Sequence, residues 1–148
     1  MLIIHCAATT PTMNIGVKEI NRWHKQRGFF NFASGLSIGY HYVIRRDGTV
    51  EKGRPDSEAG AHAKGYNAHS LGICLVGGID ANGKPENNFT PEQWGALIEL
   101  VIKLAKSYHI SRDKIIGHNQ VAAKDCPCFS VPEWIEEHKD IFEKEGIK

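Results

Sequence analysis

Two short and almost continuously apolar segments constrain the fold of this chain most strongly. They read LIIHCA at residues 2–7 and LGICLVGGI at residues 71–79, and the first is rich in β-branched residues. A strand that is apolar at nearly every position is typical of a sheet covered on both faces. We therefore expect both segments to be buried strands, and the first of them to open the fold.

Three other segments carry apolar residues at helical spacing. The first follows Asn14, which can cap a helix, and ends near Gly28. The second begins at Thr90, where a threonine cap, a proline at the first helical position and a glutamine two residues later form a strong start signal. The third covers residues 132–142. These patterns predict three amphipathic helices.

The remaining segments predict short strands and one long loop. Segments 40–44 and 49–52 flank the letters RRDG, and two β-rich segments around Asp-Gly are a strong hairpin signal. KIIGH at 114–118 predicts another strand, whereas 54–70 is rich in Gly and Ala without a period. Because strands alternate with helices and no linker divides the chain, we expect an α/β (α+β) fold. It would be a single domain over residues 1–148 with a central, mixed but mainly parallel sheet flanked by helices.

Composition narrows the functions open to such a domain. A chain of 148 residues can bury a core without disulfides, and a net charge of +1 without a basic stripe argues against a nucleic-acid partner. The apolar start lacks both a basic flank and a long hydrophobic stretch, so neither a secretory signal nor membrane insertion is expected. The placement of the four cysteines suggests reduced thiols in a cytoplasm rather than a disulfide framework.

Two histidines and a cysteine form a candidate set of metal ligands. His5 lies near the end of the first strand, His118 follows the KIIG strand, and Cys126 lies in the loop beyond it. A zinc ion in a hydrolytic site typically has three nitrogen or sulfur ligands and a fourth position for water. Adjacent central strands would bring all three residues to one edge of the sheet.

The residues alone leave simpler interpretations open. Their spacing matches no local zinc pattern, such as a His-Glu-x-x-His helix. A lone histidine at a strand end is more often a hydrogen-bonded core residue, and Cys6 and Cys74 are expected to act as small hydrophobic side chains. A thiol hydrolase with Cys126 as nucleophile and His118 as base is another alternative.

Several motifs in unbroken order carry a resemblance to a known family. They are IIHCAAT, IGYHYVIRRDGTVEKGR, GAHAKGYNAHSLGICLVGG, FTPEQW, GHNQVAAKDCPCF and VPEW, spread from about residue 2 to residue 138. Together they are similar to the zinc-dependent N-acetylmuramoyl-L-alanine amidases. The likeness is greatest to short phage lysozymes, or endolysins, of this kind, which share a fold with peptidoglycan recognition proteins.

The resemblance implies a substrate, a cofactor and a role for each matching residue. Bacterial peptidoglycan would be cut between N-acetylmuramic acid and L-alanine, with one Zn²⁺ as cofactor. In the family, residues matching His5, His118 and Cys126 bind the zinc ion. Those matching Tyr40 and Lys124 assist the reaction, and those matching His62 and Asn67 would line the substrate groove.

This sequence departs from the family pattern in two places. The segment 30–37 is longer than usual, which would reshape one wall of the groove. Cys128 stands where the family generally has a small residue. We interpret it as an inert neighbour of Cys126, with an alternative ligand or a partner in oxidative inactivation as the other readings.

The resemblance also leaves two functions besides catalysis open. The same fold serves non-catalytic peptidoglycan binding in relatives whose ligand cysteine is replaced, and the complete ligand set argues against that function here. Some phage lysozymes of this type bind RNA polymerase through residues that precede the first strand. Because the sequence begins almost at the strand expected here, we expect RNA polymerase binding to be weak or absent. We expect a monomer, synthesised in the cytoplasm without a signal peptide and acting on the cell wall after release.

Overall fold

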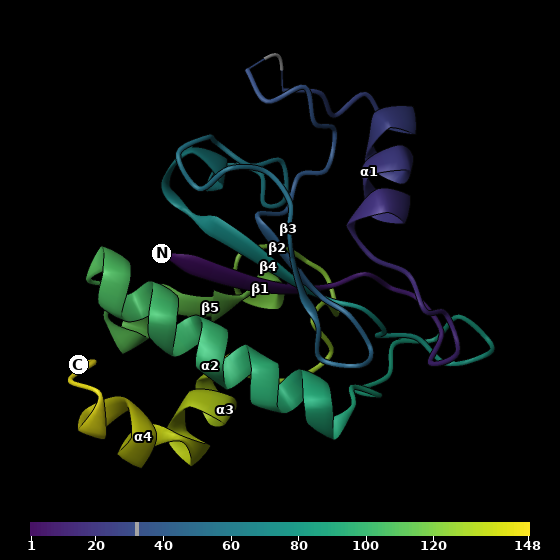
Figure 1. Ribbon diagram of the computed structural model, residues 1–148. Helices are drawn as coiled ribbons and strands as arrows, with labels where there is room; N and C mark the ends of the chain where they lie inside the picture. The colour runs from purple at the N-terminus through teal and green to yellow at the C-terminus, as the bar shows by residue number, and fades with distance from the viewer. Residues whose placement is uncertain (32) are drawn as a thin grey trace.

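The computed structural model describes residues 1–31 and 33–148 and contains one five-stranded sheet (Figure 1). The strand order is β3-β2-β4-β1-β5, with β3 antiparallel to β2 and all other neighbours parallel. The expected α/β class with a mixed, mainly parallel sheet is confirmed. The strands are β1 Leu2–Cys6, β2 Tyr42–Ile44, β3 Val50–Lys52, β4 Leu71–Leu75 and β5 Ile115–Gly117.

Helices cover both faces of the sheet. In Figure 1, α2, α3 and α4 lie together on one side and α1 lies apart from them on the other. None of the helices that the described residues form is long and apolar enough to cross a membrane. The helices are α1 Val17–Gln26, α2 Pro91–Tyr108, α3 Val131–Glu137 and α4 Lys139–Lys144, with short 3₁₀ helices at η1 Asn67–His69, η2 Arg112–Lys114 and η3 His118–Gln120.

Side chains along β1 alternate between the two faces of the sheet, and this determines which helices each of them contacts. Leu2, Ile4 and Cys6 belong to the core cluster that contains the buried side chains of α2, α3 and α4. Because successive side chains of a strand point to opposite faces, Ile3 and His5 face the other way. His5 therefore lies on the α1 side of the sheet, where it is 1% exposed.

The first turn of α2 is joined to the carboxyl ends of two strands by Gln93. This side chain is fully buried and donates through Nε2 to the carbonyl oxygens of Ile44 (3.1 Å) and Val76 (2.8 Å). The predicted cap at Thr90 is confirmed, since its hydroxyl accepts from the Gln93 N–H. The glutamine thus adds a second hydrogen bond to two carbonyl groups at the strand ends, where Ile44 O also accepts from the Val76 N–H and Val76 O also accepts from Arg46.

The predicted cap of α1 is wrong by two residues, because the helix begins after Gly16 instead of Asn14. The carboxylate of Glu51 accepts a hydrogen bond from the Val17 N–H at 2.9 Å. It thereby satisfies a backbone donor at the start of the helix that a capping side chain would otherwise bind. A Cβ atom at position 16 would lie 2.0 Å from Glu51 Oε1, so a larger residue there would displace this carboxylate. The Asn14 amide instead accepts from Arg45.

The predicted strand 71–79 is too long, because β4 ends at Leu75. Gly77 and Gly78 have φ values of 128° and 106°, which are incompatible with a continuing strand. The strand predicted at 114–118 is shortened to β5, and its neighbours form 3₁₀ turns. The hairpin of β2 and β3 forms as expected.

The predicted last helix is interrupted at His138, which separates α3 from α4. Its ring Nδ1 lies 2.7 Å from the carbonyl oxygen of Trp134 and donates to it. That carbonyl is the group which the His138 backbone N–H would bind in a continuous helix, and the N–H bonds to Ile135 instead. A side chain that competes for a backbone acceptor explains the break.

Side chains of α1 hold the chain segment that leads to Tyr40. Asn21 Oδ1 accepts from the N–H groups of Ser37 and Ile38, and His24 Nδ1 accepts from that of Gly39, each at 2.8 Å. Three consecutive backbone donors are thereby tied to one helix. The longer segment 30–37 includes residue 32, which lies outside the described residues, so its predicted effect on the groove stays a prediction.

We expect His24 to make folding stability depend on pH. Burial, with Arg27 and Arg54 nearby, lowers its pKa from 6.5 to about 4. Between these values the unfolded chain binds a proton at residue 24 that the folded chain does not. Acidification through this window should therefore lower the free energy of unfolding by up to about 1.4 kcal/mol per pH unit.

His24→Asn keeps an acceptor for the Gly39 N–H and removes the titrating ring. Denaturant unfolding of both proteins in metal-free buffer should show a shallower loss of stability for the variant between pH 6.5 and about 4. Histidines that do not interact with residue 24 contribute equally to both proteins and cancel in the difference. Parallel stability curves would contradict the assignment to His24.

Candidate metal centre

The register of β1 against β5 brings His5 and His118 side by side. Ile4 is paired with Gly117, so His118, the next residue after β5, falls beside His5. Their ring centroids are 4.5 Å apart. Cys126 enters from the loop between η3 and α3, and the three residues each offer a ligand atom within 4.8 Å of the others. The structure thus brings the predicted set together on the α1 face of the sheet, over the carboxyl ends of β1 and β5.

The charge states of these groups suit a metal ion. Burial, followed by the neighbouring His62, His118 and His24, lowers the pKa of His5, and burial together with Lys124 lowers the pKa of His118. Both imidazoles are therefore neutral near neutral pH, as metal ligation requires. The Cys6 N–H donates to Cys126 Sγ at 3.1 Å, a contact that stabilises negative charge on the sulfur. Two neutral nitrogens and one sulfur are donor types that zinc prefers.

The two predicted catalytic residues lie in the groove beside this cluster. The Tyr40 ring is 5.1 Å from the His5 ring. Burial is the main cause that raises the pKa of Tyr40, so its hydroxyl keeps its proton and can donate a hydrogen bond. Lys124 is exposed on the loop before Cys126. After burial, its positive charge is the second cause that lowers the pKa of His118.

The groove is basic. Besides Lys124 it is lined by Arg27 and Lys64, and none of the described residues that line it is Asp or Glu. The Arg27 guanidinium lies 4.7 Å from the centroid of the Phe29 ring, which holds it at the end of α1. Such a groove favours substrates that carry or develop negative charge. No motif in the sequence indicated Arg27, because its place in the groove depends on how α1 packs.

The two residues predicted to line the groove do so, but both also make structural contacts. His62 Nδ1 lies 2.8 Å from His5 Nε2, and burial is the main cause that lowers the pKa of His62 to about 3. Asn67 Oδ1 accepts from the N–H groups of His62 and Ala63 at 2.8 and 2.9 Å. A further residue, Ser70, places its Oγ 3.2 Å from His62 Nε2, and sequence reasoning did not identify it.

Cys128 is directed away from the ligand cluster. Its Sγ donates to the Gly78 carbonyl oxygen at 3.2 Å and lies 3.9 Å from Cys6 Sγ. Burial is the main cause that raises the pKa of Cys128 to about 12, so the thiol stays protonated. These contacts support the interpretation of Cys128 as an inert neighbour of Cys126.

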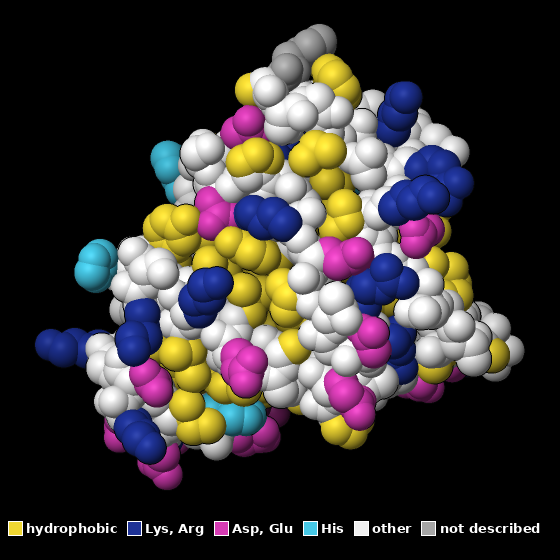
Figure 2. Space-filling view, viewed as in Figure 1, with side chains coloured by type: hydrophobic (Ala, Val, Ile, Leu, Met, Phe, Trp, Pro, Cys, Tyr) yellow, Lys and Arg dark blue, Asp and Glu magenta, His cyan; other side chains and the backbone are white. Residues whose placement is uncertain are grey.

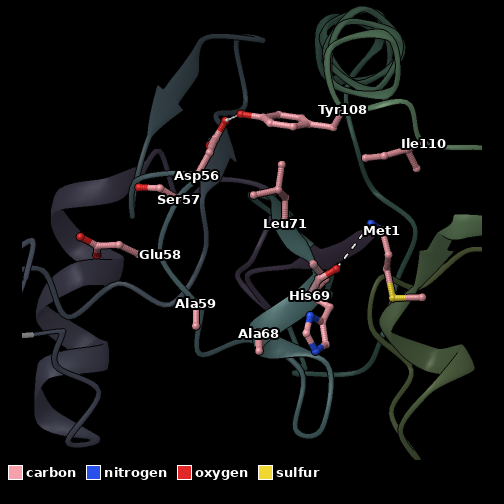
Figure 3. Close-up of a pocket in the computed structure, with 11 residues that line it drawn as sticks. Met1, Asp56, Ser57, Glu58, Ala59, Ala68, His69, Leu71, Tyr108 and Ile110 are labelled. Atoms are coloured by element: carbon pink, nitrogen blue, oxygen red, sulfur yellow. Dashed lines mark hydrogen bonds between the residues drawn. The ribbon is translucent and has the colours of Figure 1, made fainter.

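Another pocket lies at the amino ends of β1 and β4, away from the candidate ligands (Figure 3). Its one aspartate, Asp56, accepts hydrogen bonds from the hydroxyls of Tyr42 and Tyr108 and also pairs with Lys52. The carboxylate is thus occupied in holding its own loop. On the face shown in Figure 2, acidic and basic side chains are interspersed.

Comparison with known proteins agrees with this site. The family profile described as N-acetylmuramoyl-L-alanine amidase matches residues 1–129. The endolysin of Klebsiella phage KP32 is 46% identical over 145 residues, which cover 98% of this chain and 91% of that protein. Among solved structures, the N-acetylmuramoyl-L-alanine amidase LysC from Clostridium intestinale superposes with a TM-score of 0.74 at 32% identity, covering 100% of this chain and 85% of that one. Drosophila PGRP-LB superposes with a TM-score of 0.68 at 27% identity, covering 85% and 72%. The chain therefore belongs to the N-acetylmuramoyl-L-alanine amidase family of peptidoglycan hydrolases.

Proposed function

We propose that this amidase depends on one zinc ion held by His5, His118 and Cys126, and that it cuts the amide bond between the lactyl group of N-acetylmuramic acid and L-alanine. The observation that carries the proposal is the meeting of these three side chains, within 4.8 Å, in a basic groove of a chain from this family. Tetrahedral bonds of about 2.0–2.3 Å place ligand atoms roughly 3.3–3.8 Å apart, which this cluster accommodates.

The chemistry of amide hydrolysis explains why such a donor set is useful. A zinc ion held there supplies Lewis acidity to the scissile carbonyl and makes a water molecule more acidic. Two neutral imidazoles and one thiolate leave the centre with a net positive charge, which favours an oxyanion. The neutral state of His5 and His118 follows from their burial.

Tyr40 and Lys124 act on the charge that develops on the carbonyl oxygen. Tyr40 lies beside His5 with a protonated hydroxyl, which makes it a hydrogen-bond donor. Lys124 lines the same groove from the opposite loop and adds a cation. Donors that are already in place before charge develops stabilise the transition state more than the substrate.

We infer an endolysin role from the relatives of that name. In this role the chain would be made in the cytoplasm of an infected cell and would reach the peptidoglycan after release. Residues 1–148 would act as one monomeric catalytic domain. His62 and Asn67 would contact the substrate from the groove wall while also holding the structure beneath it.

Removal of zinc should abolish hydrolysis, and its return should restore it. We expect a chelator to stop both the turbidity loss of purified peptidoglycan and the appearance of new N-terminal alanine, because no side chain among the described residues that line the groove can replace a metal ion as Lewis acid. Cys126→Ala should fail to retain zinc in metal analysis. Cys74→Ala, which removes a buried thiol outside the cluster, should retain it. Lysis that survives chelation and stops on thiol alkylation would make Cys126 the nucleophile instead.

Tyr40→Phe and Lys124→Ala should each lower kcat by about 100 to 1,000-fold while zinc stays bound, because each removes one stabilising group from the oxyanion. Steady-state hydrolysis of a soluble muropeptide, with zinc content measured in parallel, checks this. Tyr108→Phe and Lys103→Ala are matched controls, since both residues are exposed and lie outside the groove. A variant with full turnover and bound zinc would remove that residue from the mechanism.

A further inference from the structure

A chain of hydrogen bonds runs from the candidate ligand His5 into the structure beneath it. His5 Nε2 lies 2.8 Å from His62 Nδ1, and His62 Nε2 lies 3.2 Å from Ser70 Oγ. Ser70 Oγ in turn lies 2.7 Å from the carbonyl oxygen of Tyr66. Each histidine in this hydrogen-bonded series has two ring nitrogens, and only one of them carries a proton when the ring is neutral. The direction in which these hydrogen bonds are donated therefore decides which nitrogen carries each proton.

The direction of the chain is set at its far end. The carbonyl oxygen of Tyr66 can only accept, so the single hydroxyl proton of Ser70 is donated to it. Ser70 Oγ must then accept from His62 Nε2, which places the proton of neutral His62 on Nε2. His62 Nδ1 is left with a lone pair that faces His5.

The same logic assigns the proton of His5. Since His62 Nδ1 accepts, His5 Nε2 must carry the donated proton, and the lone pair of neutral His5 lies on Nδ1. Metal-ligating histidines typically donate their second ring N–H to such a partner, which fixes both the tautomer and the ring orientation. In most sites the partner is a carboxylate or a carbonyl, whereas here it is a second imidazole.

The packing around His62 confines its ring. A Cβ atom at Gly60 would lie 2.5 Å from His62 Cδ2, and one at Gly72 would lie 2.7 Å from His62 Cγ. The ring thus occupies space that two glycines leave free. Asn67 also holds the backbone N–H of His62 at 2.8 Å. The position of the ring is therefore determined from both sides and from its backbone.

We propose that Ser70 and His62 are positioning residues that hold His5 in the Nε2–H tautomer, so that Nδ1 presents its lone pair to the metal. The assignment of His5 as a zinc ligand rests on the proposed function. The tautomers of the zinc-free protein follow from the hydrogen bonds alone. His62 thereby has a role beneath the metal centre that is separate from its place in the groove wall.

The direct test is the tautomeric state of the zinc-free wild-type protein. Long-range ¹H–¹⁵N correlation spectra of histidine-labelled protein at neutral pH distinguish Nδ1–H from Nε2–H rings. We expect the Nε2–H pattern for both His5 and His62. An Nδ1–H pattern for His62 would overturn the proposal, because the chain would then run in the opposite direction. This test needs no variant and no bound metal.

The second test changes the far end of the chain. Ser70→Ala removes the acceptor of His62 Nε2–H, so the Nδ1–H form of His62 should become populated and zinc should bind about 10-fold more weakly. Ser70→Thr retains the hydroxyl on a backbone that is already extended (φ −141°, ψ 156°) and should restore both properties. Zinc affinity is measured by competition with a chromophoric chelator.

Thr90→Ala is the matched control for a general loss of stability. It removes a partly buried hydroxyl that bonds Arg46 and Gln93 at the start of α2, outside the groove. It should lower the unfolding midpoint without changing zinc affinity or the histidine spectra. Wild-type zinc affinity in Ser70→Ala would overturn the proposal. A wild-type protein that shows both expected tautomers but binds no zinc would instead refute the proposed function and leave the hydrogen-bond assignment standing.

Discussion

The pairing of β1 with β5 is the constraint on which the rest of the site depends. Because Ile4 pairs with Gly117, two histidines that are far apart in the sequence occupy neighbouring positions on one sheet face. A shift of one residue would turn His5 toward the apolar core under α2. The burial of Leu2, Ile4 and Cys6 against the helices therefore keeps His5 on the side where His118 and Cys126 meet it.

Near His5 and His118 the structure buries several uncharged imidazole rings, and basic side chains line the groove above them. Burial is the main cause that lowers the pKa of each of His5, His24, His62 and His118. Neutral rings act as hydrogen-bond acceptors and as metal ligands, whereas protonated rings can only donate. The groove nevertheless remains basic, since its positive charge resides on lysine and arginine side chains at the rim.

The helix α1 supports the site without contributing a ligand to it. Asn21 and His24 accept three consecutive backbone N–H groups and so place the segment before Tyr40. On the other face, Gln93 ties α2 to the ends of β2 and β4. The segments around the groove are thus held through backbone groups that bond to polar side chains of two helices.

The sequence by itself determined the fold class, the positions of most elements and the family, because apolar periodicity and a series of separate motifs are local properties. It also indicated His5, His118 and Cys126, whose side chains match those motifs. It misplaced the cap of α1 and the ends of β4 and of the last helix, where Glu51, two glycines at positive φ and the ring of His138 override local preference. Only the tertiary structure identified Ser70 and Arg27 and the bond between His5 and His62. These roles arise from contacts between distant segments, and no local pattern encodes which nitrogen of a buried ring meets which partner.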